Sequence, residues 1–130
     1  GPLLDRIDLH VEVPPVKFRE MSAQDGGENS TTIRARVIAS RQIQSKRFGG
    51  KIACNARMQS RDLQRHCALD DSTRDLLKMA MEELDLSARA YDRILKVART
   101  IADLAGAESL GVEHVSEAIQ YRSLDRQIWT

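Results

Sequence analysis

The feature that most constrains the fold is a long stripe of aliphatic residues in the second half of the chain. Its members share the three- and four-residue spacing of one helix face: Tyr91, Ile94, Leu95, Ala98, Ile101, Ala102 and Ala105. Ser87 comes just before the stripe and is a good helix-capping residue, and Gly106 comes just after it and suits the left-handed turn that ends many helices. The pattern predicts a helix between these two residues with a buried apolar face.

Shorter patterns of the same kind predict further helices on both sides. Aromatic residues make up 4% of the chain and hydrophobic residues 42%, so aliphatic side chains must build the core, which favours packed helices over a β-sandwich. The other expected helices are one capped by Ser30 or Thr31 and running to about Arg47, short pieces between residues 54 and 67, one opened by Ser72, and one over residues 112–121.

The N-terminal segment has a different periodicity. Ile7, Leu9, Val11 and Val13 alternate with polar residues, as in a β-strand, and two prolines follow. A strand without partners exposes its edge, so we expect residues 1–15 to be disordered, docked on the helices or paired between copies. The predicted fold is mainly α: one strand (residues 1–16), a flexible loop (17–30), and a bundle of about four helices (31–130).

Charge is unevenly distributed along the chain. The net charge is +1, yet residues 30–61 contain eight Lys or Arg residues and no acidic residue, which leaves 12 basic and 19 acidic residues elsewhere. Such segregation attracts polyanions. The candidate DNA contacts in this segment are Arg34, Arg36, Arg41, Lys46 and Arg47. The alternative is that this segment meets an acidic surface of the same or a neighbouring subunit, and the sequence leaves both interpretations open.

Several kinds of site are not indicated by the sequence. The phosphate-binding pattern G-x-x-x-x-G-K-[ST] does not occur, and Cys54, His66 and Cys67 lack the spacing of a zinc site, so we expect no bound metal. His10 and His114 have no partner motif and are expected to be ordinary surface or boundary residues. No apolar run approaches a membrane span and no signal peptide opens the chain, which predicts a cytoplasmic protein.

Arg89 stands out on physical grounds. It falls in the first turn of the helix capped by Ser87, where the helix dipole disfavours a cation by about 0.3–1 kcal/mol. Arg93 and Lys96 continue the same face. A cationic face at a helix N-terminus can meet an anion. The simpler explanation is an ion pair with Asp85 or Asp92, because exposed ion pairs are common and weak.

Three segments resemble known proteins. GPLLDRIDLHVEV (residues 1–13) resembles the end of the core of magnesium-chelatase-like AAA+ ATPases, where a Leu-Leu-x-Arg-[Phe/Ile]-Asp segment leads into the last core strand. SARAYDRILKVARTIADL (residues 87–104) and EAIQYRSLDR (residues 117–126) are similar to the bacterial competence protein ComM family. The resemblance covers nearly the whole chain. It implies a helical lid that follows an ATPase core.

The resemblance also implies roles for two arginines. Arg6 matches the arginine finger that reaches the nucleotide of a neighbouring subunit, and Arg89 matches the sensor-2 arginine at the start of a lid helix. ATP and Mg²⁺, a homo-oligomeric ring, DNA as a partner and a bacterial cytoplasmic location are implied for the full-length parent. The Walker A and B segments are absent from the sequence, so this chain alone is not expected to hydrolyse ATP.

Two other functions stay open. A chelatase-type ATPase of this kind can remodel a protein instead of processing DNA. Alternatively, the chain is a stand-alone helical module that binds nucleic acid without an ATPase partner. A Walker A motif upstream in the parent gene excludes the second, and DNA-stimulated ATP hydrolysis separates DNA processing from protein remodelling.

Overall fold

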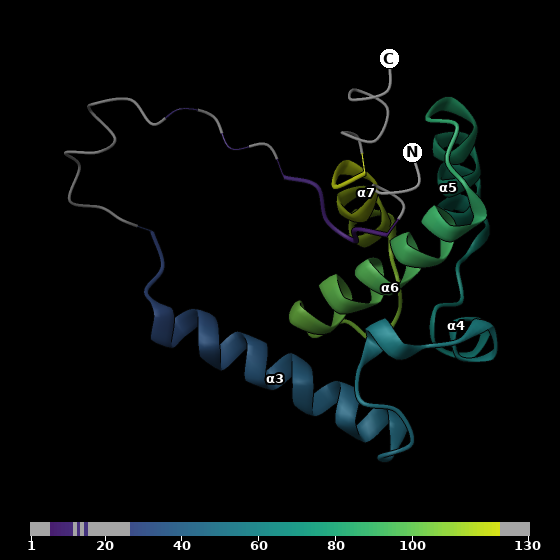
Figure 1. Ribbon diagram of the computed structural model, residues 1–130. Helices are drawn as coiled ribbons and strands as arrows, with labels where there is room; N and C mark the ends of the chain where they lie inside the picture. The colour runs from purple at the N-terminus through teal and green to yellow at the C-terminus, as the bar shows by residue number, and fades with distance from the viewer. Residues whose placement is uncertain (1–5, 12, 14, 16–26, 123–130) are drawn as a thin grey trace.

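The computed structural model describes residues 6–11, 13, 15 and 27–122. Within them the chain is helical, which confirms the predicted mainly α fold (Figure 1). In chain order the elements are α3 (Ser30–Phe48), the 3-10 turn η1 (Asn55–Arg57), α4 (Ser60–His66), α5 (Asp71–Glu83), α6 (Ala88–Leu104) and α7 (Val112–Gln120). Most of the expected loop, residues 17–26, lies outside the described residues.

Helix α6 is the centre of the fold and packs against α3, η1, α4 and α7. The middle of its stripe is buried as predicted, with Ile94, Ala98 and Ala102 each 0% exposed, whereas Tyr91 and Ala105 at its two ends are exposed. Leu77 of α5 and Val115 of α7 belong to the same hydrophobic core. Burial of this stripe is the main stabilising term for a helix of this kind, because intrinsic helix propensity alone is weak.

Both predicted ends of α6 are confirmed. The Ser87 hydroxyl accepts a hydrogen bond from the Ala90 amide at 3.2 Å. Gly106 has φ = 71°, and the Ala107 amide donates back to the Ala102 carbonyl at 2.8 Å. This is the hydrogen-bond pattern of a Schellman turn, in which glycine adopts the left-handed conformation without the strain that a Cβ atom causes.

Two other helices begin earlier than predicted. The Asn29 side chain caps α3 by accepting from the Thr32 amide at 2.8 Å, whereas Ser30 or Thr31 was expected to cap it. The Asp70 side chain caps α5 by accepting from the Thr73 amide at 2.8 Å, ahead of the expected Ser72. Asn and Asp are at least as good caps as Ser and Thr, and each comes first along the chain.

The predicted strand is not present in the described residues 6–11, 13 and 15. Residues 6–11 instead lie against α6 and α7: Asp8 pairs with Arg93, and Arg122 donates to the Ile7 carbonyl. The His10 amide donates to the Tyr121 carbonyl at 2.8 Å. A strand needs a neighbouring strand to bond its amides and carbonyls, and here helix-end groups take that place.

The two histidines are buried, whereas surface or boundary positions were expected. His10 is 8% exposed, in the segment against α6 and α7. His114 is 6% exposed, and its Nδ1 atom accepts a hydrogen bond from the Gly111 amide at 2.9 Å at the start of α7. His114 therefore satisfies a helix-end amide that would otherwise lack a partner.

A buried polar cluster fixes α3 and η1 on α6. The Asp103 carboxylate accepts two hydrogen bonds from Arg47 at 2.8 and 2.6 Å, one from Asn55 at 2.9 Å and one from Arg99 at 3.2 Å. Arg99 also donates to the carbonyls of His66, Ala107 and Glu108. A buried charge is tolerated when it is paired and fully hydrogen-bonded, so this cluster sets how α3 sits on α6.

No helix in the part of the chain that the structure describes is long and apolar enough to cross a membrane.

Candidate functional site

Arg89 is exposed in the first turn of α6, two residues after the Ser87 cap. Arg89 forms no ion pair with Asp85, with Asp92 or with any other described residue. The simpler explanation for this cation, a local salt bridge, is therefore wrong. Arg89 presents a positive charge that no described carboxylate compensates, where the helix dipole is also positive, and this arrangement suits an incoming anion.

The turn before α6 determines where Arg89 lies. Asp85 has φ = 50°, a left-handed backbone conformation that residues other than glycine rarely adopt. The Leu86 amide donates to the Met81 carbonyl at 3.0 Å, and the Asp85 amide donates to the Glu82 carbonyl at 3.4 Å. This Schellman turn ends α5 and directs the chain into α6 within three residues.

Arg6 lies in the segment that contacts the same helix. Arg93, one turn after Arg89, pairs with Asp8. Arg6 itself is exposed and has no ion pair with any described residue. The structure therefore brings the segment that carries Arg6 onto α6, and leaves the guanidinium groups of Arg6 and Arg89 both accessible.

The five candidate DNA contacts fall into different environments. Arg34 and Arg41 are exposed on α3, and Arg36 on the same helix pairs with Glu28 at 2.9 Å. Arg47 is committed to Asp103 and is largely buried. Lys46 is exposed and faces a pocket at the C-terminal end of α3.

This pocket has a volume of about 460 Å³ and forms where α3, the Gly49 turn and α4 meet. Gly49 has φ = 56° and ends α3, so that the chain reverses and α4 faces the end of α3. We call it the basic pocket; its ionisable lining residues are Lys46, Arg47, Lys51, Arg61, Asp62, Arg65 and His66. The single carboxylate among them, that of Asp62, accepts a hydrogen bond from the Gln59 amide at 2.9 Å.

The cations of the basic pocket act on His66, one of its lining residues. The pKa of His66 is lowered, first by burial and then by the charges of Arg47 and Arg65. Lys51, Arg61 and Arg65 were not among the sequence-based candidates. The four-residue spacing of Arg61 and Arg65 was the available signal, because it puts both on one face of α4.

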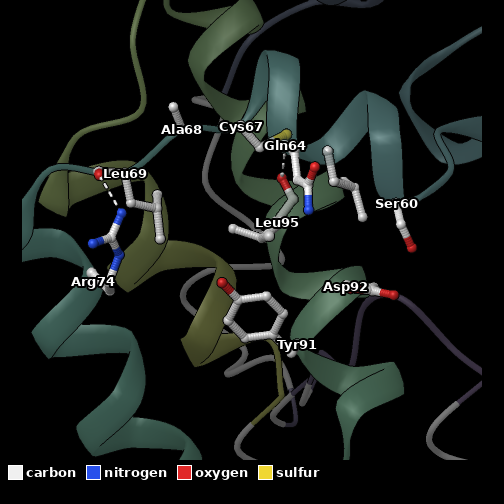
Figure 2. A pocket seen from close by; sticks show the side chains of 10 residues that line it. Ser60, Gln64, Cys67, Ala68, Leu69, Arg74, Tyr91, Asp92 and Leu95 are labelled. Carbon is white, nitrogen blue, oxygen red and sulfur yellow. Dashed lines mark hydrogen bonds between the residues drawn. The ribbon is translucent and has the colours of Figure 1, made fainter.

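A second pocket, of about 420 Å³, lies between α4, α5 and α6 (Figure 2). Leu69, Leu95 and the Tyr91 ring line it, with Tyr91 and Leu95 neighbours on α6. Arg74 donates to the Leu69 carbonyl at 3.3 Å, and Asp92 contributes one opposite charge. With one cation and one anion on its wall, this pocket lacks the excess of positive charge that lines the basic pocket.

The cysteines are in different surroundings. Burial raises the pKa of Cys67 to about 11, and its Sγ atom lies 3.8 Å from the Leu95 carbonyl oxygen. Cys54 is partly exposed. Within the described residues, no group of three His, Cys, Asp or Glu side chains is placed to hold a metal ion.

Residues 27–122 match the family model described as magnesium chelatase, subunit ChlI C-terminal. The chain belongs to this family. The matched region contains α3 to α7, and therefore includes Arg89 and the basic pocket, whereas Arg6 lies before it. The resemblance to magnesium-chelatase-related proteins is confirmed.

Curated relatives of this magnesium chelatase C-terminal domain include the competence protein ComM of Haemophilus influenzae, which is 44% identical over 127 residues. Two uncharacterised proteins named YifB are 41% identical in Salmonella typhimurium and 39% identical in Escherichia coli. Each match covers 97% of this chain and 24% of the relative. The chain thus spans about a quarter of the length of the relatives it matches.

Proposed function

We propose that this domain is the lid of a magnesium-chelatase-related AAA+ ATPase, and that Arg89 contacts the phosphates of bound ATP as the sensor-2 arginine. The observation that carries the proposal is the guanidinium of Arg89 in the first turn of α6, which is exposed and pairs with no described residue. A helix N-terminus that bears an unpaired cation is costly without an anion nearby. A local rule broken in this way is typical of functional positions.

Arg6 takes the role of an arginine finger in this proposal. Its exposed guanidinium reaches the nucleotide bound by a neighbouring subunit of a ring and stabilises negative charge that develops on the transferred phosphoryl group. Mg²⁺ and ATP would be bound mainly by other parts of the full-length protein, and the metal would supply positive charge toward the phosphates. Arg6 and Arg89 supply only positive charge, so this chain alone has no hydrolytic activity.

The test is alanine substitution of Arg89 in a full-length protein that contains this domain. Arg89→Ala should lower ATP hydrolysis by at least about tenfold, because a charge-assisted contact to phosphate is lost. Folding should be unchanged or slightly stabilised, since an unfavourable charge leaves the helix N-terminus. Arg74→Ala is the matched control, because Arg74 is also an exposed arginine in the first turns of a helix. Normal hydrolysis by the Arg89 variant would remove the sensor-2 assignment.

DNA is the substrate we propose for the full-length ATPase, and the basic pocket carries this part of the proposal. Its exposed cations, Lys46, Lys51, Arg61 and Arg65, surround one space and fit a phosphate backbone. Reversing Lys51, Arg61 and Arg65 to Glu should abolish salt-sensitive DNA binding and DNA-stimulated hydrolysis. Unchanged binding would favour a remodelling ATPase that acts on a protein.

A further inference from the structure

The first half of α3 stands clear of the helical bundle (Figure 1). Residues 30–39 are all exposed, and we call them the free half of α3. Ile33 and Val37 are 44% and 46% exposed there. Ile33, Val37, Ser40 and Gln44 follow one another at spacings of four, three and four residues, so they lie on one face of α3. Ser40 and Gln44 are buried against the bundle. The face that packs on the bundle therefore continues as an uncovered apolar stripe.

Positive charge borders this stripe. Arg34 and Arg41 are on one side of it by helical position, Arg36 is on the other, and α3 contains no acidic residue. Phosphate groups need only the cations and gain nothing from two exposed aliphatic side chains. A protein partner with an apolar side chain between carboxylates fits both features of the free half.

The outward face of α5 has this complementary pattern. Asp75, Met79 and Glu82 share one side of the helix by their spacing of four and three residues, opposite the buried Leu77. Met79 is 57% exposed, and its flexible thioether side chain adapts well to an apolar groove. Asp71 is exposed on the same side, 3.8 Å from Arg74, and the exposed Lys78 adds one positive charge, so carboxylates outnumber cations on this face.

We propose that the free half of α3 docks on the outward face of α5 of a second copy of this chain. Met79 of one copy packs against Ile33 and Val37 of the other, and Asp75 and Glu82 face Arg34 and Arg41. The two surfaces differ and lie at different ends of the molecule (Figure 1), so each copy can engage one neighbour with each. Such head-to-tail contacts close into rings or extend into filaments. The inference rests on the ring proposed above and specifies which surfaces of neighbouring lids are in contact.

The test is a charge exchange measured by sedimentation of the chain at low salt. Arg34→Glu with Arg41→Glu should weaken self-association at least about tenfold, and so should Asp75→Lys with Glu82→Lys, because each variant repels its own kind. An equimolar mixture of the two should associate as strongly as the unchanged chain, because each acidic α3 then meets a basic α5. Ile33→Ser with Val37→Ser should also weaken association. All these positions are exposed, and circular dichroism checks that each variant stays folded.

Three outcomes would overturn the proposal: an unchanged chain that stays monomeric at millimolar concentration, variants that associate as well as the unchanged chain, or a mixture that fails to recover. A loss of DNA binding in the Arg34 and Arg41 variant without any change in association would assign the free half to DNA instead. Arg89→Ala is the control, because it should lower ATP hydrolysis in the full-length protein by at least about tenfold and leave this association unchanged. The docking and the sensor-2 role can therefore fail independently.

Discussion

Asp103 shows how strongly one side chain can hold this domain together. Burial by itself would raise its pKa, but the hydrogen bonds from Arg47 and Asn55 and the charge of Arg99 outweigh burial, and the pKa is lowered. Its ionised form is therefore part of the folded structure. The carboxylate accepts from three residues that belong to α3, η1 and α6, so it joins elements that are distant in the sequence.

Asp103→Ala should lower the free energy of unfolding by about 3 kcal/mol or more, because two arginines are left partly buried without their carboxylate. Urea unfolding at neutral pH measures this loss. Asp75→Ala is the control: Asp75 is exposed, and its replacement should change stability by no more than about 0.5 kcal/mol. Equal effects of the two substitutions would show that the Asp103 cluster does not stabilise the fold.

The pH dependence of stability follows from the same residue. The folded pKa of Asp103 lies below its unfolded value, so its contribution is fully present above the unfolded value, about 3.9, and is lost as the pH falls through the folded pKa. The unchanged domain should lose stability steeply below about pH 4. The Asp103→Ala variant should show a shallower loss in this range, measured by urea unfolding at several pH values.

At the residue scale, the position of Arg89 in the first turn of α6 is confirmed, because its cap, Ser87, precedes it by two residues of the same segment. The Asp103 cluster could not be identified, because Arg47 is 56 residues away and nothing local pairs them. The basic pocket was missed in part for the same reason: Arg61 and Arg65 face Lys46 only once the Gly49 turn has reversed the chain.

At the scale of elements, α6 was predicted correctly because its signals lie within one segment. Its apolar stripe indicates a helix, and its two end residues indicate where the helix begins and ends. The prediction of a strand was wrong, because Ile7, Leu9 and Val11 can form a strand only beside a partner strand. Residues 6–11 lie against helices instead. The predicted caps of α3 and α5 differ from the observed ones by only one or two residues, which is the usual spread in where a helix is said to begin.

The turn between α5 and α6 offers a test at this scale. Asp85→Gly should raise the free energy of unfolding by about 0.5–1 kcal/mol, because a left-handed residue with a Cβ atom is strained and glycine is not. Asp85→Ala removes the same charge but keeps the Cβ atom, so it should give no gain. Thermal unfolding of the three proteins compares them. If both variants gained equally, the carboxylate and not the backbone would be the cause.

At the scale of the whole molecule, the helical core joins α3 to α7 through α6, whereas residues 6–11 are attached at its surface. Leu9 and Val11 remain 49% and 62% exposed, so this segment buries little apolar area. Its attachments are mainly polar and involve Arg93, Tyr121 and Arg122. The family match over residues 27–122 agrees with this division, since it contains the core and excludes the segment.

Removal of residues 1–20 should therefore leave a cooperatively folded domain that begins at Met21. We expect one sharp thermal transition, lowered by a few degrees because the bonds to Arg93 and Arg122 and the burial of His10 are lost. Hydrogen exchange should stay slow in the middle of α6, where Ile94, Ala98 and Ala102 are fully buried, and become faster at the end of α7, where Tyr121 loses the His10 amide. Arg93→Ala in the whole chain separates the Asp8 ion pair from the rest of this effect. A broad transition together with fast exchange throughout α6 would place the N-terminal segment in the core of the domain.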